Sequence, residues 1–147
     1  MDPRNHDHLS AALRHLRDAE HLFEPGQPWH SADQAYHLAG FAPECARKAT
    51  LSVAGFDQAI GHGISEASEL ALAVALTLDP RSQRYRTSNL AAHHPALEAW
   101  SENCRYERTG TRPDPEVTAI LADARAVVDS IASALWMDGV VPAGFEW

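Results

Sequence analysis

Apolar residues recur at helical spacing in five stretches of the chain, and turn-forming residues separate these stretches. The first predicted helix covers about residues 7–23 and ends before Pro25-Gly26; its apolar positions are Leu9, Ala12, Leu13, Leu16 and Ala19. The second is predicted to begin at Ser31, because Ser31 and Gln34 have the spacing of a capping box, and to continue to about Val53. Both stretches have the period of helices that bury one face.

Three further helices are predicted in the rest of the chain. One covers about residues 64–78, with Leu70, Ala71, Val74 and Leu78 as apolar positions. A short one starts at Pro95 and directs Leu97 and Trp100 inward. The last starts with Asp114 as its N-cap, and Gly139 ends it. Its apolar stripe is formed by Ile120, Leu121, Ala124, Val127, Val128, Ile131 and Leu135.

The composition favours the same fold class. A chain of 147 residues is long enough for one core and too short for two ordinary domains. Its 26 alanines, against seven valines and four isoleucines, favour helix over strand, because alanine loses no side-chain entropy in a helix. The sequence therefore predicts an all-α fold, an antiparallel bundle of about five helices. We expect a single domain over residues 1–147 with its core at about 8–137.

The charge balance limits the classes of partner. Twelve basic against 20 acidic residues give a net charge of −8, which disfavours a generic phosphate-binding surface. Residues 81–112 alone hold six arginines and three glutamates, which suit either a solvated loop or a local site for phosphate or an acidic partner. No apolar run reaches the roughly 18 residues of a membrane span, and the polar start lacks the form of a signal peptide. We therefore expect a soluble, cytoplasmic protein without a membrane partner.

A polar stripe is predicted along the second helix. Asp33, His37, Glu44 and Lys48 fall within roughly 60° of one another at ~100° per residue, and the opposite side carries mostly alanines. Glu44 and Lys48 have the favourable orientation of an i,i+4 ion pair, and Lys48 is the only lysine in the chain. Two interpretations remain open here: a solvated helix face with an incidental ion pair, or a polar pocket lined by rings.

The second helix also carries a family resemblance. The segments AEHLF (19–23) and ADQAYHLAGFAPECARKATL (32–51) resemble HEPN domains, small helical bundles of prokaryotic defence and toxin systems. Further on, Gly61-His62 is similar to the GH before the third helix of that family, and Trp100 with Arg105-Tyr106 is similar to its W…RY element. The resemblance covers about residues 8–135. In the second helix the matching positions are Tyr36, Leu38, Ala39, Gly40, Glu44, Cys45 and Lys48.

The resemblance implies a function for these residues. The leading hypothesis is a noncatalytic HEPN-like binding module, which works as a homodimer or with a nucleotidyltransferase-type partner protein in a defence or toxin-antitoxin system. RNA or a nucleotide is the ligand class that the resemblance implies, and no cofactor is expected. The polar groove would involve Glu44, Lys48, His62, Arg105 and Tyr106, and the predicted binding residues also include Tyr36, His37 and Trp100.

Two enzymatic alternatives stay open. HEPN ribonucleases pair an arginine with a histidine, with four to six residues between them, which would make Arg86 and His93 the catalytic residues of a metal-independent ribonuclease toxin. Eleven arginines and nine histidines give about two such spacings by chance, and the chain contains two, the other being Arg14 with His21. The second alternative is a small-molecule or biosynthetic enzyme with a pocket between helices, lined by the aromatic residues Trp29, Tyr36, Trp100 and Tyr106.

Metal and thiol chemistry have little support in the sequence. No two of the nine histidines lie three or four residues apart, the spacing with which one helix chelates a metal, so no dedicated helix-borne zinc site is expected. Cys45 and Cys104 lack the spacing of a metal site or a disulfide framework, and neither has a base beside it in the sequence. We expect both to be buried free thiols.

Overall fold

The chain folds as an all-α helical bundle, as predicted. The structure is a computed structural model, and it describes residues 3–51, 61–62, 66–79, 82–85 and 89–141. Within these residues helices are the regular elements, and strands are absent. No helix in the described part of the chain has the length and apolar character needed to cross a membrane.

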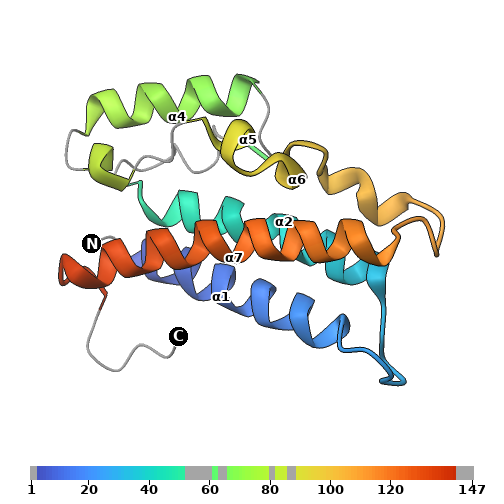
Figure 1. Cartoon of the computed structure of the whole chain (residues 1–147). Coiled ribbons are helices and arrows are strands. Elements are labelled where there is room, and N and C mark those ends of the chain that lie inside the picture. The colour runs from blue at the N-terminus through green and yellow to red at the C-terminus, as the bar shows by residue number, and fades with distance from the viewer. Residues whose placement is uncertain (1–2, 52–60, 63–65, 80–81, 86–88, 142–147) are drawn as a thin grey trace.

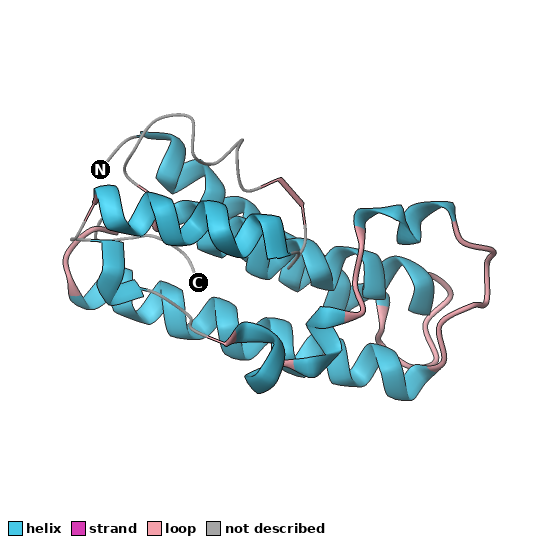
Figure 2. Ribbon diagram, turned by 90° about the horizontal axis from the view of Figure 1, so that it is seen from above, coloured by secondary structure: helices cyan, strands magenta, loops and turns pink. Residues whose placement is uncertain are grey.

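Three long helices form the body of the molecule: α1 (Pro3–Leu22), α2 (Ala32–Ala49) and α7 (Asp114–Met137). Figure 1 shows α1 and α2 as antiparallel neighbours, with α7 packed alongside them in the direction of α2. Figure 2, seen from above, shows that the described part of the chain consists of helices joined by loops. Because α2 contacts both α1 and α7, it is the central helix of this bundle.

The apolar stripes predicted on the first and last helices lie in the core. The five apolar positions predicted on α1 are buried, and so are six of the seven predicted on α7, with Leu121 partly buried beside them. Against them α2 presents small side chains, which allow the neighbouring backbones to approach closely. The alanines of α2 in this core are Ala35, Ala39, Ala42, Ala46 and Ala49.

The helix ends differ from the predictions by small amounts. Ser31 is the N-cap of α2, as predicted, but its side chain makes no capping hydrogen bond, so the predicted capping box is not formed. The helix ends at Ala49, where the N–H of Thr50 bonds the carbonyls of Arg47 and Lys48; Val53, the predicted end, lies outside the described residues. The N-cap of α7 is Pro113 rather than Asp114, and Gly139 at φ 66° follows its end.

Short elements cover one side of the long helices: α4 (Glu66–Leu78), η1 (Ser82–Tyr85), α5 (Leu90–His93), α6 (Pro95–Glu98) and η2 (Glu102–Tyr106). The carboxylate of Asp123 on α7 anchors α6: Oδ2 accepts the N–H of Ala96 at 3.0 Å, and Oδ1 lies 3.4 Å from Nδ1 of His94. Arg84 and Tyr85 bind Asp138, which fixes η1 to the end of α7. Leu97 and Trp100 point inward and are buried, as predicted.

The packing of α4 is separate from the main core. Its buried residues Leu72 and Ala75 form a small second cluster with Leu51, and Ala71 packs against it. Figure 1 shows α4 set apart from the three long helices. The apolar stripe predicted on this helix was therefore wrong for three of its four positions: Leu70, Val74 and Leu78, which recur every four residues, are exposed. The buried face is the one that carries Leu72 and Ala75.

Candidate functional site

Glu44 is the centre of a charged network on α2. Its Oε1 atom accepts hydrogen bonds from Nζ of Lys48 at 2.7 Å and lies 2.9 Å from Nδ1 of His62. Glu44 is buried, and the Lys48 side chain is only 12% exposed, whereas that of His62 is 53% exposed. The pair is therefore not an incidental contact on a solvated face, and His62 connects it to solvent.

An aromatic cluster adjoins this network, with Phe41 at its centre. The Phe41 ring packs edge-on against Trp100 at 4.8 Å and against His37 at 4.9 Å between centroids. It also contacts the rings of His62 at 6.0 Å and His15 at 5.8 Å. The rings and the charged network therefore form one site, which lies along α2 and includes residues from α1 and the segment after α6. Phe41 was not predicted as a site residue; its position between His37 and Glu44 on one helix was the available signal.

The Trp100 ring packs directly against α2 at Gly40. A Cβ atom at Gly40 would overlap the indole ring of Trp100, so only glycine allows this close approach. The indole Nε1 donates a hydrogen bond to the carbonyl oxygen of His37 at 3.1 Å, which fixes the ring on the surface of α2. These two residues come from separate parts of the sequence on which the HEPN resemblance rests, and here they are in contact.

Two histidines of the cluster are shifted toward their neutral form. Burial lowers the pKa of His37, and the positive charges of Arg105 and His15 add to this effect. Burial and Arg14 likewise lower the pKa of His15, while Asp18 and Glu44 oppose them. Nδ1 of His37 is buried, with no hydrogen-bond partner among the described residues. At neutral pH these imidazoles contribute rings and dipoles to the site rather than positive charge.

The other predicted binding residues lie outside this cluster. Tyr36 is buried beneath Arg112, whose guanidinium carbon lies 4.2 Å from the ring centroid. Tyr106 is 75% exposed and stacks with the exposed Arg105, whose guanidinium carbon lies 4.8 Å from the ring centroid. In the described part of the chain no hydrogen bond or ion pair joins Arg105 or Tyr106 to Glu44 or Lys48, so the groove as predicted is only partly assembled.

Tyr36 belongs to a structural contact at the start of α2. Asp33 accepts backbone N–H bonds from Gly110 at 2.6 Å and from Arg112 at 2.9 Å. Although partial burial works against the charged carboxylate, these donors hold the pKa of Asp33 below its ordinary value. Arg112 is in turn held by Glu107, whose Oε1 lies 2.6 Å from Nη2. The contact fastens the loop before α7 onto α2, which gives Tyr36 a packing role.

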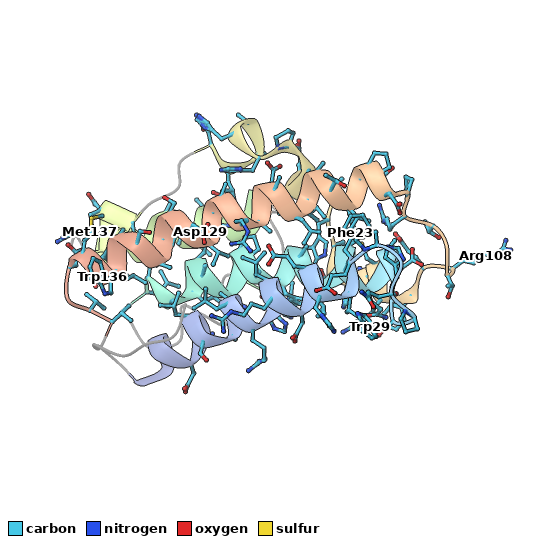
Figure 3. The ribbon with its side chains drawn as sticks, turned by 60° about the horizontal axis from the view of Figure 1, so that its bottom comes forward. Phe23, Trp29, Arg108, Asp129, Trp136 and Met137 are labelled. Atoms are coloured by element: carbon cyan, nitrogen blue, oxygen red, sulfur yellow. The ribbon has the colours of Figure 1, made fainter. Side chains whose placement is uncertain are left out.

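Of the residues predicted for the two enzymatic alternatives, the aromatic set can be compared fully with the structure and the ribonuclease pair only in part. His93 is exposed at the end of α5, and Arg86 lies outside the described residues. Trp29 stacks on His21 at one end of the bundle, the end at which Figure 3 also shows Arg108. Within the described residues, no ring contact joins any two of the four aromatic residues proposed to line a ligand pocket.

Neither an activated thiol nor a group of possible metal ligands is found in the described part of the chain. Burial raises the pKa of Cys45 to about 11, so its thiol stays protonated and is a poor nucleophile at neutral pH. Both cysteines are free and only partly buried, rather than buried as expected. Among the described residues no three His, Cys, Asp or Glu side chains are grouped as metal ligands.

The site thus combines a carboxylate in contact with Lys48, a half-exposed imidazole and a group of packed aromatic rings. Such an arrangement suits binding through hydrogen bonds, charge and ring contacts. Comparison with known proteins found no matching family model, no similar curated protein and no similar solved structure.

Proposed function

We propose that this chain is a noncatalytic HEPN-like binding module that acts with a nucleotidyltransferase-type partner protein. The observation that carries the proposal is the network of Glu44, Lys48 and His62 on α2. Taking two charges out of water is costly, and an apolar pair of similar volume is often neutral or more stable. A buried ion pair of this kind is therefore weak evidence for stability and supports a role in recognition.

The geometry favours binding over catalysis at this network. Lys48 and His62 share one oxygen of Glu44, so the carboxylate charge is already compensated by neighbouring donors. A general base needs its proton-accepting atom within reach of the substrate, and a nucleophile needs an adjacent base to activate it. His62 is instead placed to bond a group on a partner, because half of its side chain faces solvent.

Assembly with a second copy of the chain is part of this proposal. Leu70, Val74 and Leu78 form an i, i+4, i+8 ridge on the exposed face of α4. Ridges of this spacing pack against one another when two helices cross at about −50°. Size-exclusion chromatography with light scattering should therefore report a dimer that Val74→Ser converts to a monomer; a monomeric wild-type protein would contradict this part.

The partner proposal predicts that a nucleotidyltransferase is encoded beside the gene for this chain, and the product of that gene is the partner used in the test. The two purified proteins are titrated by calorimetry, and the double variant Glu44→Gln/Lys48→Met should weaken the complex by about tenfold or more. This variant removes both charges together, so neither is left buried alone. The matched control, Glu20→Gln/Arg125→Gln, removes an ion pair on the exposed face between α1 and α7. Equal losses in both double variants, or no complex with wild type, would contradict the proposal.

An RNA cleavage assay separates this proposal from the ribonuclease alternative. The noncatalytic module should leave RNA intact. Cleavage that disappears in both Arg86→Ala and His93→Ala, with an unchanged melting temperature, would replace the proposal with a ribonuclease that uses this pair. The readout is informative because His93 is exposed, and its replacement should leave the fold undisturbed.

A further inference from the structure

Arg47 is the most deeply buried cation for which the structure gives side-chain contacts. It lies on α2 with 3% of its side chain exposed, and Nη2 donates to Oε1 of Glu69 on α4. Its Nε atom is also buried, but has no hydrogen-bond partner among the described residues. A buried donor without a partner is destabilising, and a guanidinium has five donors arranged to hold oxyanions. The Glu69 carboxylate therefore satisfies only part of this group.

A small cavity adjoins the guanidinium. Arg47 lines it together with Gly40, Glu44, Leu90 and Trp100, and its volume is about 10 Å³. That is room for about one water molecule, so a larger oxyanion fits only if a neighbouring group leaves. Glu69 does not line the cavity, but it occupies Nη2 of Arg47 on the α4 side, and the ligand would take its place there. Its side chain is 37% exposed, whereas Glu44 and Trp100 are buried in the bundle.

The attachment of α4 allows such a displacement. Among the α4 side chains that the structure describes, Leu72 and Ala75 are the buried apolar ones, and with Leu51 they form a cluster apart from the main core. Elements with few buried apolar contacts open at a lower free energy than the global unfolding of the protein. Figure 1 shows α4 outside the group of three long helices, and its described buried residues share no cluster with the main core.

We propose that Arg47 is a binding site for a phosphate group, that Glu69 blocks this site in the closed form, and that the ligand displaces Glu69 and releases α4. Carboxylates and phosphates present oxygens to the same guanidinium donors. Without Glu69, the positive charges of Arg47 and Lys48 exceed the negative charge of Glu44 among the described side chains of this site, which favours a dianion. The inference goes beyond the proposed partner function, because an oxyanion site on Arg47 stands or fails without any partner protein.

The first test is titration of the full chain with inorganic phosphate and with AMP at constant ionic strength. Glu69→Gln keeps the size of the side chain and removes the competing charge, so it should bind phosphate roughly tenfold more tightly than wild type. The control Glu20→Gln removes the carboxylate partner of the exposed Arg125 and should bind as wild type does. Equal affinity for phosphate and AMP identifies the phosphate alone as the ligand, and tighter binding of AMP identifies a nucleotide; both support the site.

Two results would overturn the proposal. One is the absence of phosphate binding in both wild type and Glu69→Gln, and the other is binding that Glu69→Gln strengthens no more than Glu20→Gln does. Arg47→Gln should abolish binding; because this variant can also fail to fold, the decision rests on Glu69→Gln.

Hydrogen exchange provides the second, independent readout. Saturating phosphate should speed the exchange of α4 amides in wild type and leave those of α7 unchanged, because only α4 is released. In Glu69→Gln the α4 amides should exchange faster even without phosphate. Phosphate that instead protects α4 from exchange would overturn the displacement of Glu69.

Discussion

The helices α2 and α4 show that burial does not follow apolar character. α4 has the more apolar sequence, EASELALAVALTL, yet it exposes Leu70, Val74 and Leu78. α2 contains six polar or charged residues, and two of its charged side chains, Glu44 and Arg47, are nevertheless buried. The alanines of α2 let α1 and α7 approach closely, which places α2 at the centre of the bundle.

The difference indicates two levels of stability in one chain. The helices α1, α2 and α7 share a continuous core, whereas α4 contributes to a separate cluster of few residues. Unfolding of the three long helices should therefore be cooperative, and α4 should open on its own at a lower free energy. Charges are retained on α2 because they are paired, and apolar residues remain exposed on α4 because no described element covers them.

The largest expected effect comes from truncating the main core. Ile120→Ala should lower the free energy of unfolding by about 3–4 kcal/mol, because Ile120 is buried completely between the long helices. Leu72→Ala makes the matching cavity under α4 and should lower it by less than about 1 kcal/mol, because α4 opens locally. Urea unfolding followed by far-ultraviolet circular dichroism measures both values. Equal losses would mean that α4 is part of the same cooperative unit.

Removing one charge of the buried pair should have the next largest effect. Lys48→Met leaves Glu44 poorly solvated beside His62 and should cost about 3 kcal/mol, whereas Glu44→Gln/Lys48→Met should cost less than the sum of the single changes. A double-mutant cycle by urea unfolding gives the coupling free energy. A coupling below about 0.5 kcal/mol would identify the pair as ordinary surface charge.

Gly40→Ala tests whether the Trp100 ring packs directly against the backbone of α2 at Gly40. The added methyl group overlaps the Trp100 ring, and the resulting shift of the ring should cost about 2 kcal/mol. Trp100→Leu gives the new methyl group more room. In the Trp100→Leu background, Gly40→Ala should therefore lower the unfolding free energy by much less than it does in the wild-type background. Thermal unfolding of the four proteins checks this, and equal penalties for Gly40→Ala in both backgrounds would exclude the overlap as the cause.

Acidification should weaken the main core more than α4. Because burial lowers the folded-state pKa of His37 and His15, the unfolded chain binds more protons than the folded chain below the ordinary histidine pKa. The free energy of unfolding should stay constant above about pH 6.5. It should fall as the pH drops from there toward the lowered pKa values of His37 and His15 in the folded protein. Urea midpoints of wild type and His37→Gln across this range test the prediction, since the variant should lose less stability on acidification.

The smallest effect is expected on the exposed face of α4. Leu70→Ser removes an apolar side chain that is already in water, so the unfolding free energy at low protein concentration should change by less than about 0.5 kcal/mol. If Leu70→Ser lowered the free energy of unfolding as much as Leu72→Ala does, this face of α4 would be covered in solution.

The main features of the fold follow from the sequence because periodic apolar stripes determine which helix faces meet. The burial of Glu44 and Lys48 was foreseeable in part, since a lone lysine four residues after an acid stood out on α2. The roles of Phe41 and Arg47 were not predicted, because they depend on contacts with Trp100 and Glu69 from distant segments. The prediction of Tyr36 as a binding residue failed for the same reason, since Arg112, 76 residues further on, covers its ring.

The contact between Trp100 and Gly40 also gives the chain a built-in optical reporter. Trp100 is buried, whereas Trp29 and Trp136 are exposed, so the indole on α2 should emit fluorescence at shorter wavelength than these two. A protonated imidazole can accept an electron from an excited indole, and the ring centroids of His37 and Trp100 are 6.3 Å apart, so protonation of His37 should dim the emission of Trp100. The blue edge of the emission spectrum therefore reports both the docking of Trp100 on α2 and the protonation of His37 beside it.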